Sequence, residues 1–141
     1  MSTEFKHIVR LAGRDLDGTR RVAYALTQIK GINLRLADAI VKKAEISPDK
    51  RLGNLSESEI RRIEDTILNL SSSGLPNWLL NRRKDLETGK DIHLITSDLD
   101  LKVKEDIERE KAIKSWRGYR HSYGLKVRGQ EPEQRVEKEK P

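Results

Sequence analysis

The fold of this chain is constrained most by two helical patterns that meet at Gly31. Apolar residues recur at helical spacing on both sides of it, at Val22, Ala25, Leu26 and Ile29 and then at Leu36, Ala37, Ile40, Val41 and Ala44. Gly31 can adopt the left-handed conformation that ends many helices, and Asn33 is a suitable N-cap for the second helix. Because the helices over 19–30 and 34–44 are separated by only a few residues, we expect an angular helical hairpin.

Further short elements are predicted downstream of the hairpin. Ser56-Glu57-Ser58-Glu59 has the pattern of a capping box, and it precedes a third apolar stripe at Ile60, Ile63, Ile67 and Leu70. Serine, glycine and proline from Ser71 to Pro76 indicate a boundary or hinge. A small β-hairpin is expected after it, with strands at 78–80 and 92–95 and a reversal at 87–89.

A long helix is predicted from Ser97 or Asp98 to about Lys114. Its apolar stripe is narrow and consists of Leu99, Val103 and Ile107. Beyond Trp116 we expect the chain to run extended, because three glycines interrupt any helix, at Gly118, Gly124 and Gly129. We therefore divide the chain into three parts: a helical hairpin domain over 1–75, a linker with the small hairpin and long helix over 76–115, and a basic tail over 116–141.

The most basic part of the chain lies between Lys114 and Gln130. It carries five Lys or Arg and no carboxylate, and so holds +5 of the formal net charge of +6. Three of the six aromatic residues lie within it, at Trp116, Tyr119 and Tyr123. Cations neutralise phosphates while rings and guanidinium planes stack on unpaired bases, so we interpret this segment as nucleic-acid-binding. A solvated basic tail, a nuclear or membrane-surface address, and an aromatic anchor for the long helix are the alternatives.

The rest of the composition limits the class of protein. Residues 1–113 carry 21 basic and 19 acidic side chains, so their bulk charge would not attract phosphate. No stretch approaches the ~20 apolar residues of a membrane span, and no sustained apolar run opens the chain, so neither membrane insertion nor a secretory leader is expected. Without cysteine there are no disulfides or thiolate metal sites, which fits a reducing cytoplasm.

Catalytic and metal-binding patterns are hard to find. His7, His93 and His121 are far apart in sequence and have no neighbouring ligand residues. Asp15-x-Asp17 resembles the start of a calcium loop, but the required Gly and Glu are missing, so we interpret it as a turn before the first helix. Ser71 to Ser73 lack any nucleophile motif and read as linker. We therefore predict no enzymatic activity, no cofactor and no metal.

The turn Gly31-Ile32-Asn33 is a second candidate for contact with nucleic acid. It resembles the hairpin of helix-hairpin-helix modules, in which a glycine permits close approach and a helix N-terminus faces a phosphate; here Asn33 replaces the last glycine. Arg20, Arg21 and Arg35 are the nearby cations on the two helices. A simple helix cap and turn is the alternative interpretation.

Several longer motifs carry a family resemblance over about residues 5–130. They are Ile8-Val9-Arg10-Leu11-Ala12-Gly13-Arg14-Asp15-Leu16-Asp17-Gly18, the hairpin around Gly31-Ile32, Trp78-Leu79-Leu80-Asn81-Arg82, Trp116-Arg117-Gly118-Tyr119-Arg120-His121, and Gly124-Leu125-Lys126-Val127-Arg128-Gly129-Gln130. With them the chain resembles the small-subunit ribosomal protein family numbered thirteen in bacteria and eighteen in eukaryotes, in its archaeal-like form.

The resemblance implies a mainly α fold, with a helix-two-turns-helix N-terminal domain, a long helix and an extended basic tail that penetrates ribosomal RNA. It implies a place in the head of the small subunit, in the cytoplasm, beside ribosomal protein nineteen. It also implies a bridge to the large subunit and a tail directed at transfer RNA in the peptidyl site. The expected RNA-binding residues are Lys114, Arg117, Tyr119, Arg120, His121, Lys126 and Arg128, together with Gly31, Ile32, Asn33, Arg20 and Arg21.

The chain departs from the family pattern after Gln130. Family members continue with a basic run, whereas Glu131 to Pro141 contains four Glu, so we expect a solvated end that does not repeat the transfer-RNA contact. Two alternatives come from other classes. A DNA-repair glycosylase shares the helix-two-turns-helix module, but the chain lacks the catalytic N-terminal residue and cysteine zinc finger of those enzymes. A free regulatory RNA-binding protein would act away from the ribosome.

Overall fold

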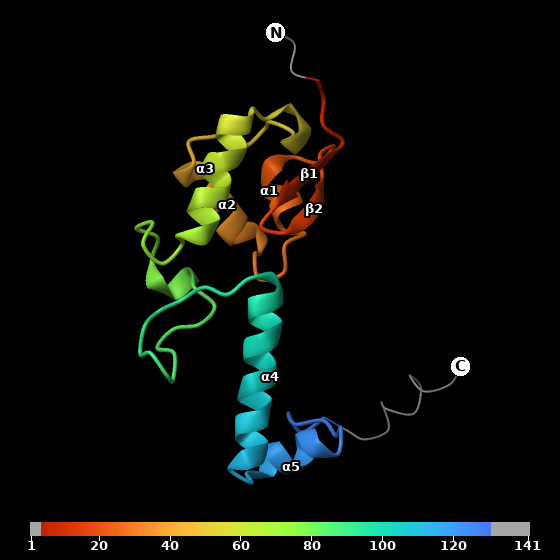
Figure 1. Ribbon diagram of the computed structural model, residues 1–141, viewed down its shortest axis with the longest axis vertical. Helices are drawn as coiled ribbons and strands as arrows, with labels where there is room; N and C mark the ends of the chain where they lie inside the picture. The colour runs from red at the N-terminus through yellow and green to blue at the C-terminus, as the bar shows by residue number, and fades with distance from the viewer. Residues whose placement is uncertain (1–3, 131–141) are drawn as a thin grey trace, which may run out of the picture. The chain divides into compact units, whose positions relative to one another are not determined.

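The structure, a computed structural model, describes residues 4–130 and contains two compact units, the first ending at Leu99 and the second beginning at Asp100 (Figure 1). The first unit holds β1 (Ile8–Leu11), β2 (Arg14–Asp17), α1 (Val22–Leu26), α2 (Leu34–Lys43), α3 (Glu57–Leu68) and two short 3-10 helices, η1 (Leu52–Asn54) and η2 (Asn77–Leu79). Helix α4 (Thr96–Ala112) crosses the boundary, and α5 (Trp116–Ser122) belongs to the second unit. The predicted mainly α fold is confirmed. The acidic end, 131–141, lies outside the described residues.

The first elements of the described chain form an antiparallel β-hairpin, which was not predicted from the sequence. Strands β1 and β2 pair with Val9 opposite Leu16 and Leu11 opposite Arg14. Ala12 and Gly13 connect them with φ of 48° and 76°, as a two-residue type I′ turn requires. Asp15 and Asp17 therefore lie on a strand, which corrects their interpretation as a turn.

Helix α1 is shorter than the predicted 19–30. After Leu26 the chain continues in tight turns, in which Ile29 N–H donates to the Leu26 carbonyl and Ile32 N–H to the Ile29 carbonyl. The Gln28 side chain accepts a hydrogen bond from Asp17 N–H at 3.1 Å, so it is engaged with the β-hairpin instead of continuing a helix. The apolar residues predicted from the helical pattern are nevertheless all buried.

The core of the first unit lies between the β-hairpin, the helical hairpin and α3. Its fully buried large side chains are Leu11, Leu16, Val22, Leu26, Ile29, Ile40, Val41, Leu52 and Ile63. Asn33 caps α2 by accepting from Leu34 N–H at 2.7 Å, and Ser56 and Glu59 form the predicted capping box of α3. Both predicted helix starts are thus confirmed.

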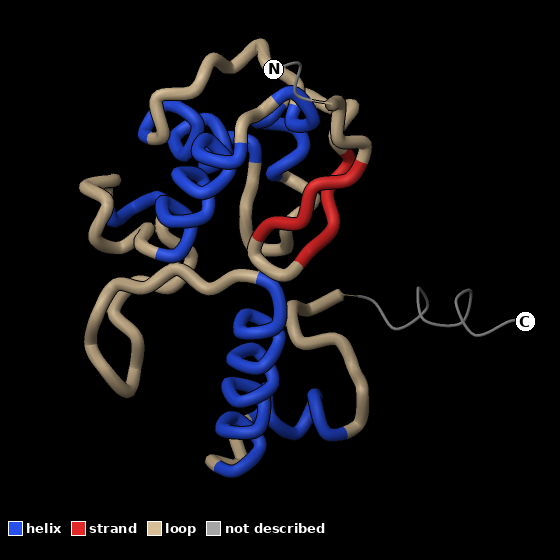
Figure 2. The backbone as a smooth tube through the Cα atoms, turned by 45° about the horizontal axis from the view of Figure 1, so that its top comes forward, coloured by secondary structure: helices blue, strands red, loops and turns tan. Residues whose placement is uncertain are grey.

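The predicted second hairpin forms only in part. Arg82 and Ile92 make a single antiparallel bridge, and Figure 2 shows the surrounding chain as loop. Side chains take the place of a backbone ladder here: the Asn81 amide exchanges hydrogen bonds with the backbone of Leu94, and the Asp91 carboxylate accepts from Lys84 N–H. The expected strands at 78–80 and 92–95 are therefore absent, although the chain reverses at 87–89 as predicted.

A buried carboxylate holds this loop together. Asp85 accepts hydrogen bonds from Arg82 Nε at 2.5 Å and from Thr88 Oγ1 at 3.1 Å. Chiefly because of the Arg82 guanidinium, and further because of Thr88, the pKa of Asp85 is lowered to about 2. The carboxylate thus stays ionised at neutral pH and fixes the reversal between Arg82 and Lys90.

Candidate nucleic-acid interface

The basic segment begins at a sharp reversal after α4. Lys114 has a φ of 58°, and Ser115 then caps α5 by accepting a hydrogen bond from Gly118 N–H at 3.0 Å. The Ser115 hydroxyl in turn donates to Glu110 Oε2 at 2.7 Å, which joins the start of α5 to the end of α4. These contacts make α5 double back beside α4 within the second unit.

Gly118 allows the two helices to touch. A Cβ at this position would overlap the Glu110 carbonyl oxygen and lie 2.7 Å from Lys111 N. The residue is buried and lies within α5, so it permits close packing instead of interrupting a helix. The prediction that the segment runs extended from Trp116 was therefore wrong over Trp116–Ser122, and the non-helical chain after Tyr123 forms a turn and bends.

Most of the predicted cations come together around α5. Arg120 Nε donates to the Lys126 carbonyl at 2.8 Å, and Leu125 N–H donates to the Arg120 carbonyl at 2.9 Å. These two bonds fold the chain after Tyr123 back onto the helix. Consequently five predicted RNA-binding residues gather on one short stretch of structure, and they are Arg117, Arg120, His121, Lys126 and Arg128.

An open cleft of about 390 Å³ lies among α4, α5 and the returning chain. Its polar lining consists of Arg109, Arg117, Arg128 and His121 together with the carboxylates of Asp106 and Glu110. Arg109 is the member that sequence reasoning missed. No local signal marks it, since it joins the others only because α5 doubles back on α4.

The three aromatic rings of the segment form a column on the face of α5 opposite Gly118. Trp116 and Tyr119 stack with centroids 5.3 Å apart and planes 11° from parallel, and Tyr123 follows 4.7 Å beyond Tyr119. The exposed fractions of Trp116, Tyr119 and Tyr123 are 73%, 50% and 62%. The rings therefore contact each other and solvent, which argues against their role as an anchor for the long helix.

The Gly31 turn belongs to the first unit and is packed against protein. Gly31 has a φ of 100°, as predicted for a left-handed cap, but a Cβ there would lie 2.6 Å from the Leu94 carbonyl oxygen. Ile32 is buried, and Asn33 is engaged in capping α2. The close approach that glycine permits is thus made by residues 94–95 of the chain itself.

His93 also contacts this turn. Its Nδ1 accepts from Asn81 N–H at 3.2 Å, so the ring proton lies on Nε2, which donates to the Gly31 carbonyl at 2.9 Å. Burial lowers the pKa of His93 and the bond to Gly31 partly opposes that effect, so the neutral ring is favoured. This histidine therefore has a structural explanation.

The cations predicted beside this turn are exposed and weakly paired, and Arg20 and Arg21 lie just before α1, whereas Gly31 follows the other end of that helix. Arg20 lies 3.5 Å from the Asp17 carboxylate, and Arg21 lies 3.6 Å from the Asp49 carboxylate. Arg35 is exposed on α2. Exposed ion pairs of this kind contribute little to stability and leave the cations available to other anions.

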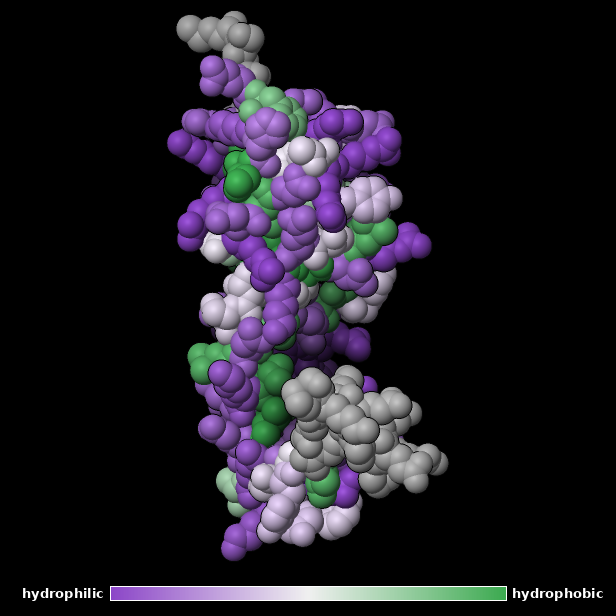
Figure 3. Space-filling model, turned by 90° about the vertical axis from the view of Figure 1, so that its right-hand side faces the viewer, coloured by the Kyte–Doolittle hydropathy of each residue, from purple (hydrophilic) through white to green (hydrophobic). Residues whose placement is uncertain are grey.

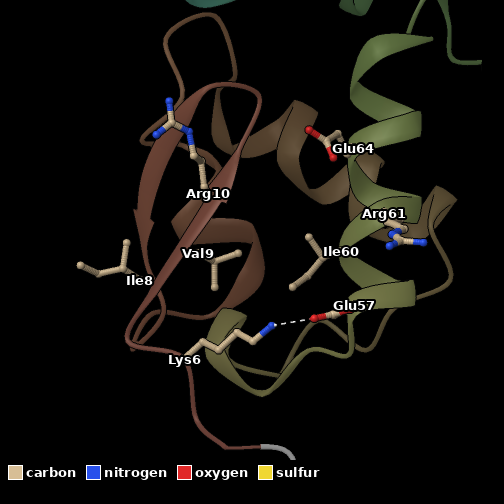
Figure 4. A pocket seen from close by; sticks show the side chains of 8 residues that line it. All are labelled: Lys6, Ile8, Val9, Arg10, Glu57, Ile60, Arg61 and Glu64. Carbon is tan, nitrogen blue, oxygen red and sulfur yellow. Dashed lines mark hydrogen bonds and ion pairs between the residues drawn. The ribbon is translucent and has the colours of Figure 1, made fainter.

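A second cleft lies between β1 and α3 (Figure 4). Side chains of both signs line it, and Lys6 Nζ lies 3.4 Å from Glu57 Oε1. Figure 4 shows Val9 from β1 and Ile60 from α3 pointing toward one another, with Arg61 and Glu64 along α3. The two carboxylates of this cleft, Glu57 and Glu64, lie at separate places along α3, and neither a histidine nor any of the predicted RNA-binding residues lines it.

Residues 4–130 contain neither a cluster of metal ligands nor a helix suited to crossing a membrane. No group of three or more His, Asp or Glu side chains in this range could hold a metal ion. Within the same range, every helix is too short or too polar to cross a membrane. The expectation that the protein needs no metal stays a prediction.

Comparison with known proteins identifies the family. Residues 10–136 match the family described as ribosomal protein S13/S18. The chain belongs to this family. As a ribosomal protein it works in the cytoplasm as part of the ribosome, and the predicted family resemblance over 5–130 is confirmed.

Several similar proteins are archaeal, which agrees with the archaeal-like form expected from the sequence. The small ribosomal subunit protein uS13 of Saccharolobus solfataricus is 54% identical over 130 residues, which cover 92% of this chain and 79% of that protein. Its counterpart in Sulfurisphaera tokodaii is 57% identical over 90% of this chain and 74% of its own length. The uS13 protein of Aeropyrum pernix is 53% identical over 91% of this chain and 85% of its own length.

Proposed function

We propose that this S13/S18 family member is a structural component of the head of the small ribosomal subunit and binds ribosomal RNA there. The observation that carries the proposal is the gathering of cations on α5 and the chain that folds back onto it. Lys114 to Gln130 contains no carboxylate, and Arg120 ties the returning chain to the helix through the Lys126 carbonyl. Such a surface neutralises phosphates of a folded RNA.

Each predicted residue has a specific role in this surface. The phosphate contacts come from Lys114, Arg117, Arg120, Lys126 and Arg128, because an RNA backbone is bound through cations. Tyr119 and His121 lie on the same helix and present rings beside those cations. Three arginines, Arg109, Arg117 and Arg128, line the cleft beside His121 and outnumber its two carboxylates, Asp106 and Glu110, so a phosphate group bound there would still meet net positive charge.

The Gly31 turn is a second contact in this proposal, and its geometry restricts what it contributes. The buried Ile32 side chain offers nothing to RNA, and Gly31 faces residues 94–95. The contact would therefore come from the backbone of Gly31–Asn33 and from the exposed guanidinium groups of Arg20, Arg21 and Arg35.

The protein partners in this proposal rest on the family resemblance. They are ribosomal protein nineteen of the small subunit, components of the bridge to the large subunit, and transfer RNA in the peptidyl site. The sequence after Gln130 is acidic, so we do not extend the transfer-RNA contact to the end of this chain. The proposed role is scaffolding and includes no catalytic step.

Sedimentation of the cellular protein tests the assignment. The tagged chain, expressed in an archaeal host, should migrate with small subunits in a sucrose gradient at a magnesium concentration that keeps the subunits intact. A variant with all five phosphate-binding cations replaced by Ala should leave that fraction. Wild-type protein that remains at the top of the gradient would instead support a free regulatory RNA-binding protein.

A further inference from the structure

The exposed ring column of α5 is the largest unexplained feature of the second unit. We define the ring column as Trp116, Tyr119 and Tyr123. Three large aromatic residues lie side by side, and each is half exposed or more. Such a cluster is unusual on the surface of a small folded unit, because covering apolar surface lowers the free energy. Figure 3 shows pale, weakly polar surface beside hydrophilic side chains in the part of the second unit that contains α5.

The helix itself makes the column face outward. Gly118 packs against Glu110 and Lys111, so residues on the opposite side of α5 point away from α4. Trp116, Tyr119 and Tyr123 are spaced i, i+3 and i+7 and share that side. Trp116 and Tyr119 are already stacked on each other, with Tyr123 tilted by 48° against Tyr119, so they form a preorganised surface whose ordering costs little when a further flat ring is added.

The charges around the column indicate what would cover it. Arg120 lies on the same side of the helix, with its guanidinium carbon 5.9 Å from the centroid of the Trp116 ring. No carboxylate occurs anywhere from Lys114 to Gln130, so a partner that carries negative charge next to a flat apolar ring is favoured. An unpaired nucleotide has this combination, with a base that stacks and a phosphate that meets a cation.

We infer that Trp116, at the head of the ring column, binds one unpaired RNA base by stacking, with Arg120 beside the adjoining phosphate. This inference rests on the proposed function and deepens it, because it makes the segment a reader of single-stranded or bulged RNA as well as a binder of backbone. A duplex keeps its bases stacked on each other and cannot offer one to the column. The surface therefore discriminates between paired and unpaired RNA.

Fluorescence of the indole tests the contact directly. The chain has two tryptophans, so in Trp78→Phe all indole emission comes from Trp116. Titration with an oligoadenylate of eight nucleotides should quench its emission, whereas a perfectly paired RNA duplex of similar charge should quench it little. Equal quenching by both probes, or quenching by neither despite binding, would overturn the inference.

Affinity measurements separate the base contact from the phosphate contacts. Trp116→Leu should weaken binding of the oligoadenylate by about 5- to 150-fold, which corresponds to ~1–3 kcal/mol for one stacked base. Its affinity for the duplex and the slope of log affinity against log salt should not change. Trp116→Tyr, which keeps a ring, should retain most of the affinity, and Trp78→Leu on the first unit is the matched control for loss of an exposed indole.

The outcomes distinguish failure of this inference from failure of the proposed function. If the chain binds both RNA probes with a steep salt dependence and Trp116→Leu changes neither affinity, only the stacking inference is wrong. If the wild-type chain binds neither probe, the proposed RNA-binding function fails as well. A variant that keeps every RNA affinity but is lost from ribosomal subunits would show that the column contacts protein, and this too would overturn the inference.

Discussion

The His93 imidazole donates a hydrogen bond from Nε2 to the carbonyl oxygen of Gly31, 2.9 Å away. The bond joins the loop after the serine-rich boundary to the turn between α1 and α2. Thr96 N–H reinforces the junction by donating to the Lys30 carbonyl at 2.9 Å. The turn is therefore held from one side by residues 93–96, and its stability should depend on the protonation state of His93.

Acid should weaken this junction. The pKa of His93 in the folded chain is lowered below the ordinary 6.5 by burial, so the unfolded chain binds a proton more readily. Its contribution to stability is complete above pH 6.5 and is lost as the pH falls below that value through the folded pKa. Urea unfolding midpoints measured between pH 8 and pH 5 should fall over this window in the wild type and fall less in His93→Gln. His7→Gln, on an exposed histidine, is the control; an equal flattening there would contradict the assignment.

Gly31→Ala should destabilise the first unit. The new Cβ would lie 2.6 Å from the Leu94 carbonyl oxygen, in addition to the cost of a left-handed φ. Gly89→Ala has a comparable positive φ of 68° with nothing within 4 Å, so it carries the conformational cost alone. We expect Gly31→Ala to lower the free energy of unfolding by about 2–4 kcal/mol and Gly89→Ala by about 1–2 kcal/mol. Equal losses in chemical denaturation would show that the contact with Leu94 is relaxed at no cost.

Asp85→Asn should reduce the loss of stability that the chain shows as the pH falls from 5 to 2. The folded pKa of Asp85 is about 2 against an ordinary 3.8, so its contribution is present above pH 3.8 and is lost as the pH falls toward 2. Thermal unfolding followed between pH 5 and pH 2 should therefore show a shallower decline in Asp85→Asn than in the wild type. Asp49→Asn, on an exposed carboxylate, should retain the wild-type slope.

Gly118→Ala should detach α5 from α4. The added methyl group would overlap the Glu110 carbonyl oxygen, which is backbone and cannot move aside without shifting α4. We expect amide hydrogen-exchange protection over Trp116–Ser122 to fall at least about tenfold, equivalent to ~1.4 kcal/mol. Gly129→Asn lies in open space at a φ of 71° that Asn tolerates, and its protection pattern should match that of the wild type.

The elements that were predictable from the sequence are those with strong local signals. The apolar periods before and after Gly31, the Asn33 cap and the capping box at Ser56 each specify a helix end through neighbours a few residues away. The β1–β2 hairpin was missed because its turn, Ala12-Gly13, lacks the usual Asn-Gly signature. The alternation of Val9, Leu11 and Leu16 around Gly13 was the available signal.

Long-range contacts decide the features that the sequence did not reveal. Gly118 looked like a helix breaker, yet its lack of a side chain matters because Glu110 lies against it. Gly31 looked available for an RNA phosphate, yet Leu94, far along the chain, occupies the space beside it. The basic composition of Lys114 to Gln130 was plain in the sequence, whereas the cleft with Arg109 and the outward ring column follow from the fold of α5 onto α4.

The central claim, that the cations of the basic segment bind RNA phosphates, is tested most directly by the salt dependence of binding to small-subunit ribosomal RNA. With four or five phosphate contacts, log affinity against log salt should have a slope of about −3 to −4.5. Replacing Lys114, Arg117, Arg120, Lys126 and Arg128 by Ala should flatten that slope by just under one unit per site, which leaves only the contribution of the Gly31 turn and its cations. Replacing five exposed cations of the first unit, Arg10, Lys42, Lys43, Arg61 and Arg62, should change it much less. A slope left unchanged by loss of the first five cations would contradict the account, because the RNA would then be held by another surface.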